Sequence, residues 1–495
     1  MRPTTPGLVL ACTLLACAPE SPPEPEPTPL SGGARGWNVV LISVDTLRAD
    51  RLGAWGYQDR PNSPAIDELA SGGVLFGDAV APRSLTWPSL ATVLTGLYPS
   101  GHGVIDNGRS LADGQPALPL LLREAGYSTA AFLSNMCRAN HQGWDHFACA
   151  GGVDRRLNRE ALAYLAPRRE AGEAGEAGEA GEKDPAADRE PPFLMWVHYF
   201  GPHPPYYNGG DRARALDPDY AGLLAPRKGV LDRVMTEPIE LDDADLRHLD
   251  ALYDAAVMGT DGLIGELLRG LSELGENDRT LVVFLADHGE DLYQHHQYLY
   301  HACSVYQSSL HVPLAFVAPG LLPAGAAIAG PVELSDVLPT VLDLLGLPPP
   351  ACIHGRSLVP ALERAVAGSV DELGVDDHFA GHAMSEYGDS LVSTFQEGSW
   401  KVVSNPDREA VPCMQGVPAG FYPIGETELY DLASDPGEQA DLSSRHPEEA
   451  ARLRERQALL RASLCPTPAA AREPEALPDD VRRQLEELGY VVRDG

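Results

Sequence analysis

The chain has 495 residues, which is enough for one large domain or two. Apolar residues make up 44% and charged residues 22%, so most of the chain can bury an ordinary hydrophobic core. Lysine and arginine number 37 against 71 aspartates and glutamates, which gives a net charge of -34. Because such an acidic surface repels phosphate backbones, nucleic acid is excluded as a partner.

The first residues have the pattern of an export signal. Met1-Arg2 precedes an apolar run, 7–15, that is too short to span a bilayer and is followed by Ala16-Cys17. This ending resembles the cleavage box of bacterial lipoproteins. It implies a signal peptide over 1–16, lipidation of Cys17, and anchoring to the cell envelope on the periplasmic side or at the cell surface. An ordinary secretory signal is the alternative. Residues 17–36, rich in Pro and Glu, are expected to form an extended tether.

Hydrophobic periodicity then predicts alternating strands and helices. Buried strands are expected at 38–44, 129–133, 193–198, 280–286 and 312–317. Helices are expected at 64–71, 88–97, 118–125 and 246–274. Strands that alternate with helices predict an α/β fold around a large, mostly parallel sheet.

Two stretches depart from that alternation. Residues 170–182 repeat Ala-Gly-Glu, and we expect 170–190 to be a low-complexity loop inserted at the surface. From 379 the pattern shortens: strands at 391–394 and 400–404 indicate a small antiparallel sheet, followed by a helix at 447–464. The predicted units are therefore a catalytic domain over 37–378, a C-terminal subdomain over 379–464, and a tail over 465–495 with a short helix at 479–488.

Six cysteines remain besides Cys12 in the signal and Cys17. An even number suits disulfides in an oxidising compartment, but the sequence does not choose among the possible pairings. No C-x-x-C zinc spacing occurs. The six are Cys137, Cys149, Cys303, Cys352, Cys413 and Cys465.

Two acidic residues follow predicted strands directly. Asp45 comes after the strand 38–44, and Asp287-His288 comes after the strand 280–286. Ligand sites of open α/β sheets lie at this carboxyl edge, so two carboxylates and one imidazole would meet there. Oxygen ligands suit Ca²⁺, Mg²⁺ or Mn²⁺, and the imidazole favours Mn²⁺ or Zn²⁺. We expect one divalent cation; the alternative is that both aspartates merely cap loops.

The motifs between and beyond these aspartates resemble the sulfatase family of the alkaline phosphatase superfamily. The segment 84–99 carries Leu-Thr-Gly-Leu-Tyr-Pro after a hydroxyl-bearing loop, and it lies between Asp45-Thr-Leu-Arg-Ala-Asp and Asp287-His-Gly-Glu. Pro202-His-Pro-Pro-Tyr, Asp336-Val-Leu-Pro-Thr and Glu428-Leu-Tyr-Asp-Leu match as well. The resemblance covers roughly 37–464. It implies an alkaline-phosphatase-like sandwich, ester hydrolysis and, by family habit, Ca²⁺, with Mg²⁺, Mn²⁺ or Zn²⁺ as alternatives.

The resemblance also implies a nucleophile where the helix 88–97 begins. Sulfatases carry Cys or Ser there and oxidise it to formylglycine, whereas this chain has Thr86, with Leu90 in the arginine position. Oxidation of threonine would give a ketone, so Thr86 cannot become formylglycine. We expect its hydroxyl to attack directly, as in the phosphatase and phosphodiesterase branches of the superfamily. A structural N-cap in an inactive relative is the alternative.

Other positions also depart from the family. Thr46 stands where a second Asp is frequent, so we expect Thr86 to join the metal ligands Asp45, Asp287 and His288. His301 stands where the family has Lys, and His203 belongs to the Pro-His-Pro-Pro motif; we assign both to catalysis. By the same resemblance, three residues would contact substrate oxygens: Arg48, Asn107 and Asn135.

The leading hypothesis is an exported, lipid-anchored, metal-dependent hydrolase of sulfuric or phosphoric esters. One alternative is a phosphodiesterase or a phosphoryl-group transferase acting on envelope glycans or lipids. Another is an inactive binding protein with a sulfatase fold. The expected partners are an ester substrate and, through Cys17, a membrane; the oligomeric state does not follow from the sequence.

Overall fold

A computed structural model describes residues 30–136, 141–176, 191–206, 209, 211–224, 231, 233–234, 239–295, 299–302, 304–368, 382–387, 392–405 and 424–465. The predicted signal peptide, Cys17, most of the tether and the tail helix at 479–488 lie outside these residues. Within the described part of the chain, none of the helices has both the length and the apolarity needed to cross a bilayer.

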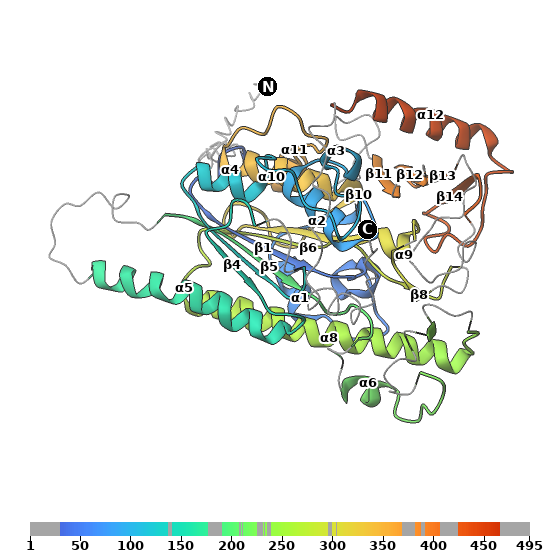
Figure 1. The fold of residues 1–495 in the computed structure, drawn as a ribbon, viewed down its shortest axis with the longest axis horizontal. Helices are drawn as coiled ribbons and strands as arrows, with labels where there is room; N and C mark the ends of the chain where they lie inside the picture. Colours follow the sequence, from blue (N-terminus) through green and yellow to red (C-terminus); the bar gives the residue numbers. More distant parts are fainter. Residues whose placement is uncertain are drawn as a thin grey trace, which may run out of the picture.

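Eight strands form the central sheet, in the order β10-β2-β9-β6-β1-β5-β3-β4 (Figure 1). All neighbouring pairs are parallel except the two that β9 makes with β2 and β6. The central strands are almost wholly apolar because helices cover both faces of the sheet. The strands are β1 (Asn38–Val44), β2 (Val74–Val80), β3 (Ser128–Leu133), β4 (His146–Cys149), β5 (Phe193–Tyr199), β6 (Thr280–Ala286), β9 (His311–Val317) and β10 (Ala326–Glu333).

Helices lie on both sides of this sheet, as Figure 1 shows. One layer contains α1 (Pro64–Ser71), α5 (Asp154–Glu176) and α8 (Asp243–Glu273), with α6 (Asp211–Leu216) packed on α8. The other contains α2 (Thr86–Thr95), α3 (Pro99–His102), α4 (Leu118–Glu124), α10 (Val337–Leu345) and α11 (Val359–Val366). The mostly parallel α/β sandwich expected from the sequence is confirmed.

The C-terminal part is a separate four-stranded antiparallel sheet with one long helix against it. The strands pair in the order β11 (His382–Tyr387), β12 (Val392–Glu397), β13 (Trp400–Ser404) and β14 (Thr427–Asp431). Helix α12 (Pro447–Ser463) packs on β12 and β13 over a small core that includes Phe395, Val402 and Leu453. A disulfide between Cys352 and Cys465 links the end of this helix to the segment that follows α10.

One pair of short strands and several short helices complete the part that carries the site. β7 (Asp291–Leu292) pairs with β8 (Leu299–Tyr300), and α9 (Gln307–Leu310) leads directly into β9. Single-turn 3₁₀ helices among the described residues are η1 (Ala49–Arg51) and η2 (Gly53–Trp55) after β1, and η4 (Leu334–Asp336) before α10.

The predicted loop at 170–182 is wrong in its first part. Helix α5 continues to Glu176, so residues 170–176 are helical, while 177–190 lie outside the described residues. The helix persists because alanine and glutamate are strong helix formers, and isolated glycines in an existing helix cost only about 1 kcal/mol each. The boundary placed at 378 stays a prediction; the small sheet begins at His382.

Candidate active site

The carboxyl ends of β1 and β6 bring Asp45 and Asp287 together. The two strands are parallel neighbours, and Val44 lies opposite Ala286 in their register. Thr46 adopts a left-handed conformation with φ of 56°, and its backbone N–H donates to Oδ1 of Asp287 at 3.3 Å. This turn, which is unusual for a β-branched residue, therefore ties the two strand ends to each other.

Both carboxylates are fully buried, and each has one oxygen that the protein holds and one that it does not. Asn135 donates through Nδ2 to Oδ2 of Asp45 at 2.9 Å, and the N–H of His288 donates to Oδ1 of Asp287 at 2.7 Å. Among the described residues, Oδ1 of Asp45 and Oδ2 of Asp287 have no hydrogen-bond partner. Buried carboxylate oxygens normally have one, so these two are placed for a ligand.

His288 faces the same two oxygens. Its Nδ1 lies 2.9 Å from the carbonyl of Gly289 and must donate to it, which leaves the lone pair on Nε2. That Nε2 is 3.6 Å from Oδ1 of Asp45 and 3.7 Å from an oxygen of Asp287. These separations are too long for good hydrogen bonds, but they match the spacing of atoms that share one cation.

Thr86 is the first residue of α2 and is fully buried. Its Oγ1 lies 3.5 Å from Nε2 of His288, so it borders the same cluster. The next N–H of the helix, that of Trp87, donates to Oδ1 of Asn107 at 2.9 Å. The helix ends at Gly96, which has φ of 66°. A hydroxyl at the N-terminus of a buried helix is well placed beside an anionic ester.

His198 is a residue of this site that the motifs do not single out. One nitrogen of His198, one carboxylate oxygen of Asp45 and one of Asp287 all lie within 4.8 Å of one another. A signal was present in the sequence: His198 is the one charged or strongly polar side chain within the apolar strand β5, close to its carboxyl end. Only the strand order, with β5 directly beside β1, places it at Asp45.

Two further imidazoles lie beside His288. The ring of His301 is 4.4 Å from that of His288 and 5.1 Å from that of His203, centre to centre. Nδ1 of His301 lies 3.2 Å from a carboxylate oxygen of Glu290, while its Nε2 has no hydrogen-bond partner among the described residues. His301 is thus held by Glu290 on one side and leaves its other nitrogen for a ligand. The motif Asp287-His-Gly-Glu ends in Glu290, but the sequence alone assigns this glutamate no role.

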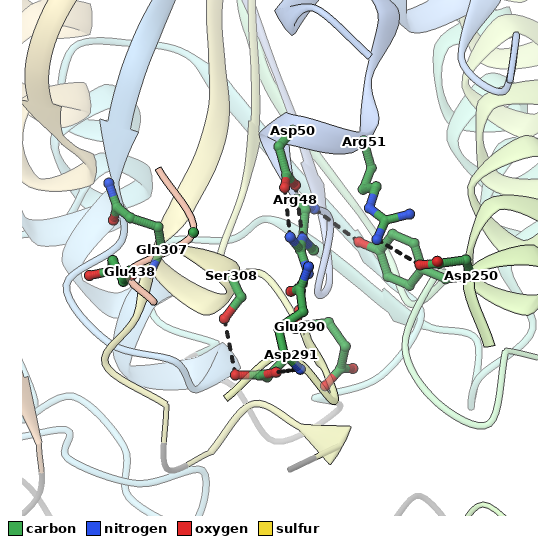
Figure 2. A network of polar contacts seen from close by, with 12 residues as sticks. Arg48, Asp50, Arg51, Asp250, Glu290, Asp291, Gln307, Ser308 and Glu438 are labelled. Atoms are coloured by element: carbon green, nitrogen blue, oxygen red, sulfur yellow. Dashed lines mark hydrogen bonds and ion pairs between the residues drawn. The ribbon is translucent and has the colours of Figure 1, made fainter. Parts of the chain in front are cut away.

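Arg48 lies next to the site and is engaged by the protein itself. Its Nε and Nη2 donate to the two oxygens of Asp50 at 2.8 and 2.6 Å (Figure 2). Its Nη1 donates to the carbonyl of Glu290 at 3.0 Å and to Oε1 of Gln294 at 2.6 Å. This geometry gives Arg48 a bracing role on the loop after His288. The substrate contact expected from the sequence stays a prediction.

The two asparagines assigned to substrate have different places. Asn135 is bonded to Asp45 and orients that carboxylate. Asn107 uses its oxygen on the N–H of Trp87, and its Nδ2 is buried with no partner among the described residues. Asn107 therefore keeps a donor for an oxygen of a ligand, whereas Asn135 acts through Asp45.

Burial dominates the electrostatics of this cluster. Desolvation, followed by repulsion from Asp287, raises the pKa of Asp45 well above its usual value, and desolvation does the same for Asp287 and Glu290. Burial lowers the pKa of His288 to about 3 and that of His203 to about 4. Burial is the largest cause of each shift, and a divalent cation bound here would stabilise the charged form of the two aspartates.

The residues present fit a divalent metal ion, as the family generally binds. Two buried carboxylate oxygens without partners face an imidazole lone pair and a hydroxyl, and the second imidazole, His198, adds a nitrogen. Carboxylate and imidazole donors are the ligand set of Mg²⁺, Mn²⁺ and Zn²⁺ sites and, for the oxygens, of Ca²⁺ sites. The predicted ligands Asp45, Asp287, His288 and Thr86 are thus brought together.

The sandwich, with a polar cluster at the carboxyl edge of its parallel strands, defines an alkaline-phosphatase-like protein. Residues 37–347 match the model of the sulfatase family. Arylsulfatase K of Xenopus laevis is 32% identical over 463 residues, which span 83% of this chain and 80% of the relative. The multifunctional alkaline phosphatase superfamily protein PehA of Trinickia caryophylli is 26% identical over 402 residues, or 66% of this chain and 77% of PehA. The chain belongs to the sulfatase family of ester hydrolases.

Solved structures have the same fold. The phosphonate monoester hydrolase of Agrobacterium radiobacter superposes with a TM-score of 0.61 at 22% identity, covering 86% of this chain and 95% of that one. A protein solved in complex with its substrate, D-glucosamine-2-N,6-O-disulfate, gives a TM-score of 0.66 at 20% identity, covering 87% of this chain and 99% of its own. The architecture predicted for the superfamily is confirmed.

Proposed function

We propose that this chain is a metal-dependent hydrolase of phosphoric or sulfuric esters in which Thr86 is the nucleophile. One observation carries the proposal: the hydroxyl of Thr86 starts a buried helix and lies 3.5 Å from Nε2 of His288, which itself faces the unpartnered oxygens of Asp45 and Asp287. A hydroxyl in that position can attack an ester group that docks at the helix N-terminus.

The expected reaction has two displacements. The oxygen of Thr86 attacks the phosphorus or sulfur, the bond to the leaving oxygen breaks, and a covalent ester of Thr86 forms. Water then attacks the same centre and restores the hydroxyl. A bound divalent ion would lower the pKa of the hydroxyl and stabilise negative charge on the ester oxygens. Asp45, Asp287 and His288 would hold that ion.

The surrounding side chains would orient the ester. Nδ2 of Asn107, whose oxygen accepts the N–H of Trp87 next to Thr86, offers a donor to an ester oxygen. Burial lowers the pKa of His301, so its ring is neutral at pH 7 and carries a single N–H. When the carboxylate of Glu290 accepts that N–H at Nδ1, Nε2 of His301 presents a lone pair, and His203 lies against the ring. Asn107 would bind an ester oxygen, and His301 would accept a proton during the reaction.

Phosphoric esters are the better match to a threonine. Formylglycine chemistry is closed to Thr86, and direct attack is the route that the resemblance assigns to phosphatases and phosphodiesterases. PehA, a relative described as multifunctional, and the phosphonate monoester hydrolase both lie in the same superfamily. The chain would act outside the cytoplasm and be anchored through Cys17, as the N-terminal sequence indicates.

The test is turnover of aryl phosphate, aryl phosphodiester and aryl sulfate by metal-stripped protein to which one divalent ion is returned. Thr86→Ala should lose about 10³-fold or more of kcat/KM, whereas Thr86→Ser should retain activity. Thr95→Val is the matched control, because its hydroxyl is buried on the same helix and bonds the carbonyl of Ala91. A phosphorylated peptide containing Thr86, found after rapid acid quench, would identify the attacking atom.

Four results would count against the proposal. Equal activity of Thr86→Ala and wild type would remove Thr86 as the nucleophile. Turnover of the sulfate ester alone would contradict the preference for phosphoric esters. No turnover of any ester, with metal still bound, would favour an inactive binding protein, and product on an added alcohol in place of water would favour a transferase.

A further inference from the structure

His198 is a buried histidine with one nitrogen in use and one without a partner. It is fully buried, and its Nδ1 lies 2.8 Å from Oγ of Ser43, which also accepts the indole N–H of Trp196 at 2.8 Å. Its Nε2 has no hydrogen-bond partner within the described part of the chain. Because Nδ1 is engaged by Ser43, Nε2 is the nitrogen left to join the oxygens of Asp45 and Asp287.

In either tautomer of His198, Nε2 faces the two carboxylates without a hydrogen-bond partner among the described residues. If Nδ1 donates to Ser43, Nε2 presents a lone pair to two carboxylates, and a cation between them would bind all three groups. If the hydroxyl of Ser43 donates to Nδ1, Nε2 carries a proton that ought to bond a carboxylate oxygen, yet no such bond forms. Atoms about 2.1–2.4 Å from one ion lie up to about 4.8 Å apart, and the nitrogen of His198 and one oxygen each of Asp45 and Asp287 lie within that distance of one another.

The residue at position 46 limits the charge around such an ion. Asp45 and Asp287 supply two negative charges, and Thr46, next to Asp45, supplies none. Calcium affinity depends strongly on the number of charged oxygen ligands, and so it is limited here. Two neutral imidazoles, His288 and His198, add no charge but strengthen binding of transition metals, which prefer nitrogen ligands more than Ca²⁺ does.

We propose that His198 is a metal ligand through Nε2 and that this second imidazole makes the site select Mn²⁺ or Zn²⁺ over Ca²⁺. The proposal rests on the metal dependence inferred above. It adds a ligand from β5 to the set of Asp45, Asp287 and His288.

The first experiment measures metal binding without turnover. Metal-stripped protein is titrated with Mn²⁺, Zn²⁺ and Ca²⁺ separately, by calorimetry and by equilibrium dialysis. His198→Gln should lower the affinity for Mn²⁺ and Zn²⁺ at least about tenfold. It should change the affinity for Ca²⁺ by less than about threefold, because an amide oxygen suits calcium. His102→Gln is the matched control: this histidine is also buried, and both its nitrogens bond groups away from the site, Thr92 and Val104.

The second experiment uses the wild-type protein, so it holds even if His198→Gln does not fold. Pulsed electron paramagnetic resonance on bound Mn²⁺ should detect nitrogen couplings from two imidazoles. One imidazole in wild type would overturn the proposal, as would an equal loss of Mn²⁺ and Ca²⁺ affinity in His198→Gln. An enzyme that turns over esters with one coordinated imidazole would leave the proposed function intact and refute this inference alone. Two coordinated imidazoles in a protein that turns over no ester would support this inference and refute the proposed function.

Discussion

Lys401 makes a buried ion pair that fastens the C-terminal sheet to the loop carrying His301. Its Nζ lies 2.6 Å from Oε1 of Glu438 and donates to the carbonyl of Val305 at 2.8 Å. Oε2 of Glu438 in turn accepts the backbone N–H of Gln307, beside which it lies in Figure 2. The side chains of Lys401 and Glu438 are 2% and 0% exposed, so neither partner can exchange the other for water.

We predict that Lys401→Met destabilises the protein by about 3–5 kcal/mol, since it leaves the carboxylate of Glu438 buried and unpaired. The double variant Lys401→Met/Glu438→Gln should recover most of that loss, because no buried charge remains and glutamine keeps an oxygen for Gln307. Its residual cost should be about 1 kcal/mol, from the carbonyl of Val305 that has lost a donor.

Urea unfolding, followed by intrinsic fluorescence, measures these differences. Arg454→Met serves as the control: this exposed residue of α12 donates to Oγ1 of Thr427 at the surface, and its loss should cost no more than about 0.5 kcal/mol. Catalytic efficiency should fall in Lys401→Met more than in the control, because the loop that carries His301 loses the hydrogen bond from Lys401 to the carbonyl of Val305. Equal urea midpoints for Lys401→Met, Arg454→Met and wild type would refute the reasoning.

Three further predictions concern metal and pH. Chelation should lower the melting temperature, since an ion present at 100 times its Kd adds about 2.7 kcal/mol to the native state, and calorimetry with and without chelator checks this. Asn135→Leu should weaken metal binding about 10–100-fold in the same dialysis assay, because Asp45 loses the donor that orients it. Burial raises the pKa of Asp261 from 3.8 to about 6, so the native state binds this proton more tightly and its stability falls as pH rises between those values. In urea unfolding, the free energy of unfolding of Asp261→Asn should rise relative to that of wild type between these pH values, and the difference should stay constant at higher pH. If the two proteins lose stability in parallel across this range, the prediction is contradicted.

The sequence was sufficient for most of the sheet and for the residues at its edge. Strands 38–44 and 280–286 were predicted with the bounds that the structure has, because fully buried parallel strands are continuous apolar runs. Asp45 and Asp287 follow those strands directly, so their meeting was predictable from the carboxyl-edge rule. The helix expected at 88–97 begins two residues earlier, and this places Thr86 on the helix itself.

Several elements were not predicted. Strands β2 and β10, at one edge of the sheet, mix small and polar residues and are partly exposed, so their pattern is weak. Within α5, the Ala-Gly-Glu repeat has the composition of a loop, but the helix that precedes it has already nucleated and carries on at low cost.

The sequence by itself determined the family, the sandwich and the two buried aspartates that we propose as metal ligands, because these depend on local runs and on motifs that lie close together along the chain. Only the tertiary structure decided what surrounds them. The order of strands places His198 beside Asp45, and the approach of β13 to the loop after β8 fixes the segment that holds His301. The tertiary structure also turns Arg48 toward the carbonyl of Glu290. Such contacts join residues separated by up to hundreds of positions, and pairings of that kind leave no periodic signal in the sequence.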